Sequence, residues 1–190
     1  MAKKINIVLI MFVVILTLFN SVFTEVKGVG INEISVSSTA FRNGDKIPLK
    51  YVCNRIPKGG NVSIPLAWTL APQGTKSLAI YMYDLNPIAK NHIHWVVVNI
   101  PIRVTSLKEG LSRTQFMPAG SVELPNTTGL AGYEGPCPPV GTGNHQYKIV
   151  VLALNTEELK LSGATTLESL QASTKGKVLG RGELSGYYRQ

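Results

Sequence analysis

The stretch "KSLAIYMYDLNPIAKNHIHWVVVNI", residues 76–100, contains two long apolar runs joined by a short polar link. Both runs are rich in β-branched and aromatic residues, which favour strands, and within each run apolar residues follow one another without regular alternation. We therefore predict two central strands, over 76–84 and 92–100, that are buried on both faces of a sheet. Because the link is short, the two strands are expected to be antiparallel neighbours.

The same kind of segment recurs along the chain, between clusters of Gly, Pro and Asn. Further strands are predicted over 34–38, 47–52, 66–70 and 146–154. Only the C-terminal part has a helical pattern, in which Thr165 and Glu168 have the spacing of a capping box and the helix ends before Gly176. The pattern as a whole predicts a mainly β domain.

The first 28 residues differ from the rest, since two lysines are followed by an apolar run from Ile7 to Leu16 that continues to Phe23. This pattern is typical of a signal peptide, and an uncleaved segment of this length would serve as an N-terminal membrane anchor. Residues 29–190 then form one globular domain. We predict an exported protein, either secreted or held in the periplasm or at the cell surface.

The charged residues give a formal net charge of +8, but the lysines and arginines are scattered. No basic run is interleaved with aromatic residues, so a nucleic acid partner is not expected. Membrane contact is expected only through the N-terminal segment. Cys53 and Cys137 form an even pair in an exported chain, which favours one disulfide, although two buried thiols remain an alternative.

Three polar residues mark the ends of the predicted apolar strands: Asp84 ends one strand, His94 begins the next, and His145 precedes the strand over 146–154. Each could simply satisfy backbone groups at a strand end. Together, beside the long irregular region from Gly110 to Gly143, they indicate a pocket, because strand ends and long loops commonly carry functional sites.

The pocket shows no nucleophile beside a base, and the common enzyme motifs are absent, so we expect binding without catalysis and without a cofactor. One alternative is an enzyme. His92 and His94 are two residues apart, so they lie on the same face of a strand, and with His145 they could hold zinc with an open position for water. The chain would then be a metal-dependent hydrolase or lyase.

Several ordered motifs resemble the phosphatidylethanolamine-binding protein (PEBP) family, and in particular its bacterial and archaeal Raf kinase inhibitor-like branch. They are "FRNGDKIPLKYVCN" (41–54), "GGNVSIPLAW" (59–68), "KSLAIYMYDLNP" (76–87), "HWVVVNIP" (94–101) and "GPCPPVGTGNHQY" (135–147). The resemblance runs from about Ile34 to the C-terminal "GYYR". It implies a PEBP-like antiparallel β-sandwich of one large and one small sheet, with a few peripheral helices.

The resemblance also implies a small anion pocket, for a phosphate or phosphorylethanolamine-type ligand. The residues at the family's ligand-binding positions are Asp84, His94, Pro138, Pro139, His145 and Tyr147. Imidazoles that gain a proton near the anion would serve as donors. Two departures remove an Arg–carboxylate support pair that the family pattern provides: Asn86 replaces an aspartate, and Gln146 replaces an arginine.

Members of the family are described as inhibitors of proteases or kinases, so the resemblance also implies a protein partner that the chain inhibits or regulates, such as a protease. Separately, Asn126-Thr127-Thr128 fits the glycosylation acceptor pattern. Because Asn126 lies in the long irregular region, we predict it as the glycosylated position.

Overall fold

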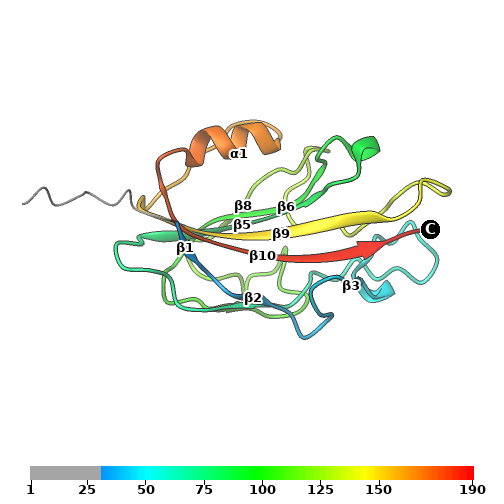
Figure 1. Cartoon of the computed structure of the whole chain (residues 1–190), viewed down its shortest axis with the longest axis horizontal. Helices are drawn as coiled ribbons and strands as arrows, with labels where there is room; N and C mark the ends of the chain where they lie inside the picture. The colour runs from blue at the N-terminus through cyan, green and yellow to red at the C-terminus, as the bar shows by residue number, and fades with distance from the viewer. Residues whose placement is uncertain (1–30) are drawn as a thin grey trace, which may run out of the picture.

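The computed structural model describes residues 31–190, which form a larger and a smaller β-sheet packed face to face, with one α-helix on the outer side of the larger sheet (Figure 1). This confirms the mainly β domain that the sequence pattern predicts and the sandwich of one large and one small sheet that the resemblance implies. The predicted signal peptide or anchor over 1–28 lies outside the described residues. Within residues 31–190, no helix has the length and apolar character needed to cross a bilayer.

The centre of the larger sheet consists of β5 (Ser77–Asp84), β6 (Ile93–Ile100) and β9 (His145–Leu154), all antiparallel to their neighbours. All eight residues of β5 are buried, as its unbroken apolar run predicts. Towards the edges, the order continues through β10 (Val178–Tyr188) to β1 (Asn32–Glu33) on one side. On the other side it ends at β8 (Val122–Glu123).

The smaller sheet has three short antiparallel strands, β2 (Val36–Ser37), β4 (Leu66–Trp68) and β7 (Ser106–Leu107). Its apolar face packs against one face of the larger sheet and forms the main core, to which Trp95 contributes the largest fully buried side chain. The opposite face of the larger sheet is covered by Leu159 and by α1 (Leu167–Thr174), which buries Leu170.

The N-terminus of α1 lies one residue later than predicted. Thr166, and not Thr165, is the N-cap. Its side chain accepts a hydrogen bond from the Ser169 N–H, and the Ser169 side chain accepts one from the Thr166 N–H. Thr165 is instead buried, and its N–H donates to the Pro125 carbonyl. The fixed spacing of three residues is therefore retained, but serine takes the place expected for Glu168.

Strand β10 was not predicted, because its sequence "VLGRGELSGYY" places three glycines in an eleven-residue strand. The glycines are required by packing on the inner face. A Cβ atom on Gly182 would lie 2.0 Å from the carbonyl oxygen of Ile34, and one on Gly186 would lie 2.7 Å from the Ile47 side chain. The N-terminal segments therefore cross β10 at backbone contact distance, which only glycine permits.

The strand predicted over 47–52 is wrong. The segment begins after β3 (Asp45–Lys46), which pairs in parallel with β10, and then forms a 3₁₀ turn, η1 (Leu49–Tyr51). Pro48 precedes this turn and cannot donate to a sheet, while its carbonyl accepts from the Tyr51 N–H at 2.9 Å. The turn directs Cys53 towards the loop that contains Cys137.

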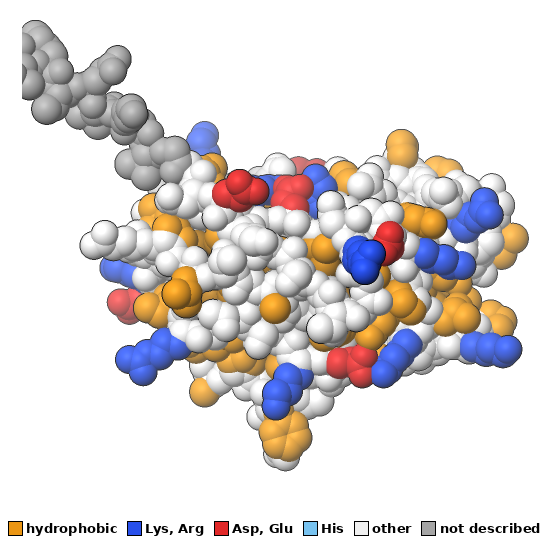
Figure 2. Space-filling view, turned by 60° about the horizontal axis from the view of Figure 1, so that its bottom comes forward, with side chains coloured by type: hydrophobic (Ala, Val, Ile, Leu, Met, Phe, Trp, Pro, Cys, Tyr) orange, Lys and Arg blue, Asp and Glu red, His pale blue; other side chains and the backbone are white. Residues whose placement is uncertain are grey.

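The charged side chains do not form a single-sign patch on the face shown in Figure 2. Lys and Arg are dispersed there among uncharged and acidic side chains. Several of the basic residues are also paired with carboxylates, including Lys50 with Glu109 and Lys148 with Glu183. This arrangement agrees with a solvated basic surface.

Candidate functional site

A cavity of about 240 Å³ lies at the end of the larger sheet where β5 ends and β6 and β9 begin. All six residues predicted as ligand-binding line it, namely Asp84, His94, Pro138, Pro139, His145 and Tyr147. The C-terminus lies at the same end of the molecule (Figure 1). There, the Gln190 side chain donates to the Pro138 carbonyl at 2.7 Å.

The sheet register explains how residues from separate strands meet at the cavity. Asp84, the last residue of β5, lies directly opposite Tyr147 of β9. In β6, Ile93 pairs with Tyr83 and Trp95 pairs with Met82, which leaves His94 as one extra residue. This β-bulge interrupts the alternation of side chains along β6, so that Ile93 and Trp95 pack into the cores on opposite sides of the sheet. His94, between them, lines the cavity.

His145 is held inside the protein wall by both of its ring nitrogens. Its Nδ1 donates to Asp84 Oδ2 at 2.6 Å, and its Nε2 lies 2.9 Å from the hydroxyl oxygen of Thr142. Asp84 and His145 are both almost fully buried. Since neither ring nitrogen is free, the geometry favours a role for His145 in fixing the loop and the Asp84 carboxylate, and it offers no donor to a ligand.

His94 differs from His145, because one of its ring nitrogens is free. Nδ1 lies 2.9 Å from the Glu134 carbonyl oxygen, which can only accept, so Nδ1 bears the proton. Burial, together with the neighbouring His92, lowers the pKa of His94 to about 4. In the protein without a bound anion, the ring is therefore neutral near pH 7 and its Nε2 is an acceptor.

The Tyr147 hydroxyl is the one free donor in the described part of the cavity wall that is fully buried. It lies near the Asp84 carboxylate and the Cys137 backbone, but neither contact has the geometry of a full hydrogen bond within residues 31–190. Burial raises the pKa of Tyr147, and the Asp84 carboxylate raises it further, so the hydroxyl keeps its proton. A buried hydroxyl without a partner is costly, and it marks a position where a bound group would be stabilised.

Sequence reasoning missed an ion pair at the cavity wall. Arg55 Nη2 contacts Glu134 Oε1 at 2.9 Å, with the arginine largely exposed and the glutamate largely buried. Burial alone would raise the pKa of Glu134, but the hydrogen bond and charge of Arg55 outweigh it, and the pKa is lowered. The pair adds a carboxylate and a cation to the cavity. Only the proximity of both residues to Cys53 and Cys137 in the sequence hinted at it.

The same carboxylate overturns the predicted glycosylation at Asn126. The Asn126 side chain is fully buried, and its Nδ2 donates to Glu134 Oε2 at 3.0 Å. Its Oδ1 accepts from the backbone N–H groups of Thr128 and Leu130. A glycan on Nδ2 would have to replace this contact in a space without solvent access, so Asn126 is a structural residue in the folded protein.

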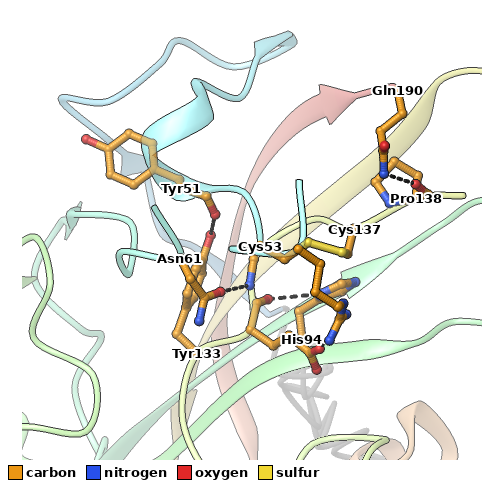
Figure 3. The surroundings of a disulfide bond; sticks show 11 residues. Tyr51, Cys53, Asn61, His94, Tyr133, Cys137, Pro138 and Gln190 are labelled. Carbon is orange, nitrogen blue, oxygen red and sulfur yellow. Dashed lines mark hydrogen bonds and ion pairs between the residues drawn. A yellow bond between two sulfur atoms is a disulfide. The ribbon is translucent and has the colours of Figure 1, made fainter. Parts of the chain in front are cut away.

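Cys53 and Cys137 are joined by a disulfide, with their Cα atoms 5.4 Å apart (Figure 3). Hydrogen bonds join the same two segments on either side of the bond. The Cys53 N–H donates to the Pro136 carbonyl at 3.0 Å, and the Gly135 N–H donates to Asn61 Oδ1 at 2.8 Å. The disulfide segment therefore forms one wall of the cavity, and Cys137 itself lines it.

The departure at Asn86 has a local structural explanation. Its Oδ1 accepts from the Ile88 N–H and caps the turn η2 (Pro87–Ala89), while its Nδ2 donates to the Asn144 carbonyl at 3.2 Å. Gln146, at the other departure, is exposed on β9. An amide bridge thus joins η2 to the loop before β9, in place of the expected Arg–carboxylate pair.

The metal alternative finds no support in the side-chain geometry. Within residues 31–190, no three His, Cys, Asp or Glu side chains converge in a group that could hold a metal ion. His92 does line the cavity, with its ring centroid 4.7 Å from that of His94. However, the contacts of His145 with Asp84 and Thr142 engage both of its ring nitrogens.

Comparison with known proteins decides the family. The sequence model described as "Phosphatidylethanolamine-binding protein" matches residues 37–189. The chain belongs to the PEBP family. This confirms the resemblance of the motifs, and the family description names a binding protein. None of the matches indicates an enzymatic activity.

Individual PEBP relatives extend the match over most of the chain. A protein named UPF0098 from Methanothermobacter thermautotrophicus is 37% identical over 157 residues, which cover 83% of this chain and 99% of the relative. The crystal structure of Escherichia coli YbcL, titled a new member of the mammalian PEBP family, is 32% identical with a TM-score of 0.75, and the match covers 83% and 98% of the two chains. This structure confirms the PEBP-like fold.

A third relative bears on export. The Mycobacterium tuberculosis protein LppC, named as a proposed lipoprotein, is 34% identical over 139 residues, which cover 73% of this chain and 64% of the relative. Its name places one PEBP relative of this chain among the lipoproteins.

Proposed function

We propose that the chain is an exported PEBP-family binding protein whose cavity holds a small phosphate monoester of the phosphorylethanolamine type without altering it. The observation that carries the proposal is the buried Tyr147 hydroxyl, which lacks a partner beside the free Nε2 of His94. Export is supported by the name of the LppC relative and by the apolar pattern of residues 1–28.

The protonation states favour a phosphate that brings its own proton. Tyr147 can donate to one phosphate oxygen, whereas the neutral His94 ring can only accept at Nε2. A monoprotonated phosphate satisfies both, since its P–OH group donates to His94 while another oxygen accepts from Tyr147. Arg55 supplies a cation at the wall. The Asp84 and Glu134 carboxylates favour a ligand that also carries an ammonium group.

Affinity for phosphorylethanolamine is expected to rise as the pH falls, by about tenfold per pH unit above roughly pH 6, where the dianion of a phosphate monoester takes up one proton. Below that value the affinity should level off, because His94, with a pKa of about 4, stays neutral. Isothermal titration calorimetry between pH 5 and pH 8 measures this. Sulfate, which stays deprotonated, is the control and should bind poorly throughout. Equal binding of sulfate, or a flat pH profile, would contradict the scheme.

Replacement of Tyr147 by phenylalanine separates binding from folding. Affinity for phosphorylethanolamine should fall about 10- to 100-fold, the range for one hydrogen bond to a charged group. The free energy of unfolding should decrease by no more than about 1 kcal/mol, since the hydroxyl makes no hydrogen bond of normal geometry within residues 31–190. The matched control is Tyr187→Phe on the partly exposed face of β10, which should change neither quantity. Unchanged affinity in the Tyr147→Phe variant would remove the main support for the site.

Inhibition or regulation of a protein partner such as a protease stays a prediction from the family resemblance. No contact within residues 31–190 favours one partner over another. Titration against a panel of serine proteases would test it.

A further inference from the structure

The disulfide presents its two cysteines to different surroundings. Cys137 is only partly buried and lines the cavity, next to Pro138. Cys53 is almost fully buried, with an exposed fraction of 2%, and it does not line the cavity. Figure 3 shows the bond between the loop that contains Cys137 and the segment that follows Tyr51. Cys137 is therefore the half of the disulfide that the cavity can present to a small molecule.

The two backbone segments that the disulfide joins are packed directly against each other. A Cβ atom on Gly135 would lie 2.3 Å from the Tyr51 carbonyl oxygen and 2.7 Å from the Cys53 nitrogen, so no free space separates the two segments. The Tyr133 hydroxyl also donates to the Tyr51 carbonyl at 2.7 Å. These contacts do not depend on the sulfur atoms, and they should hold the two segments together when the disulfide is broken.

We infer that small thiol reductants reach the disulfide of the folded protein only through the empty cavity, so that a bound ligand protects the bond from reduction. Cys137 is the site of thiol–disulfide exchange, and a ligand in the cavity blocks access to it. This inference rests on the proposed function, because the blocking ligand is the phosphate monoester. The chain thereby couples ligand binding to its redox state.

The exchange step balances with a dithiol as the reductant. One thiolate of the dithiol attacks Sγ of Cys137, the S–S bond breaks, and its electron pair passes to Sγ of Cys53, which then takes up a proton. The second thiol attacks the mixed disulfide, which releases Cys137 as a thiolate. Two electrons have passed to the protein, and the reductant leaves as a cyclic disulfide.

Reduction should also weaken the ligand site, because the remaining contacts keep the fold but no longer fix the position of the Arg55 segment covalently. Arg55 lies two residues after Cys53, and the disulfide anchors the segment that brings its guanidinium to Glu134. If the reduced protein binds the ligand more weakly by some factor, the ligand must favour the oxidised protein by the same factor, because linkage is reciprocal. Protection by the ligand is thus both kinetic and thermodynamic.

The test follows reduction of the native protein by dithiothreitol, with thiol alkylation and mass measurement at successive times. Phosphorylethanolamine at ten times its dissociation constant should slow reduction about tenfold, since only the unoccupied fraction reacts. The same concentration should give little protection to the Tyr147→Phe variant, and full protection to Tyr187→Phe. Each protein is compared with itself, with and without ligand.

Two results would overturn the inference, and they differ from failure of the proposed function. If calorimetry shows binding but the reduction rate is unchanged, protection by the ligand is refuted while the binding site stands. If reduction proceeds only through global unfolding, its rate should rise more than about tenfold per molar urea below the unfolding transition; the inference predicts less than a twofold change. If neither binding nor protection is found, both proposals fail together.

Discussion

Replacement of both Cys53 and Cys137 by serine is expected to lower the free energy of unfolding by about 4 to 5 kcal/mol. The two cysteines are 84 residues apart, and closing a loop of this size removes roughly this much conformational free energy from the unfolded chain. The hydrogen bonds between the same segments do not depend on the sulfur atoms, so the native fold should persist. Urea denaturation followed by tryptophan fluorescence measures the loss.

The slope of the denaturation curve also tests whether the disulfide stabilises the protein through its unfolded state. If the disulfide acts on the unfolded state, the variant should unfold with a steeper dependence on urea, because its unfolded chain exposes more surface. A loss below about 1 kcal/mol would contradict the loop-closure account. Titration of two free thiols in the protein isolated from its native source would show that the bond does not form there.

Replacement of Asp84 by alanine is expected to cost about 2 to 6 kcal/mol, because two donors lose their acceptor and each buried unsatisfied group costs about 1 to 3 kcal/mol. The variant leaves the almost fully buried His145 Nδ1 and the partly buried Asn86 N–H without their acceptor. The loop before β9 should loosen, and binding of phosphorylethanolamine should be lost with it. Thermal and urea denaturation, together with calorimetry, measure both effects.

Two further variants show whether the buried contact causes the loss. Asp84→Asn keeps a carbonyl oxygen that can accept from His145, so it should cost less than Asp84→Ala. Asp45→Ala removes an exposed carboxylate from β3 and should change stability by no more than about 0.5 kcal/mol. Equal stability of Asp84→Ala and Asp45→Ala would show that the Asp84–His145 contact has no structural role.

The central strands could be predicted from the sequence, because a long apolar run indicates a strand that is buried on both faces. The polar residues that end these runs then mark the strand ends. The runs at 76–84, 92–100 and 146–154 became β5, β6 and β9 within a residue at each end. Asp84, His94 and His145 then meet because adjacent antiparallel strands place their ends at one edge. The ordered motifs added the family and, through it, the prolines and Tyr147.

Features that depend on packing between distant segments could not be predicted. The glycines of β10 resemble turn signals, and only the approach of Ile34 and Ile47 explains them. The free nitrogen of His94 depends on a bulge and on the Glu134 carbonyl, while His145 loses its free nitrogens to Asp84 and Thr142. Two histidines with similar sequence positions thus acquire different chemical roles from their surroundings.

The most direct test of the binding site is a crystal structure of the protein grown with phosphorylethanolamine at a pH near 6. We expect tetrahedral density in the cavity, with one phosphate oxygen within hydrogen-bond distance of the Tyr147 hydroxyl and another near Nε2 of His94. The ammonium group should lie towards the Asp84 or Glu134 carboxylate. An empty cavity at a saturating ligand concentration, or phosphate density only on the outer surface, would contradict the assignment of this cavity as a phosphate monoester site.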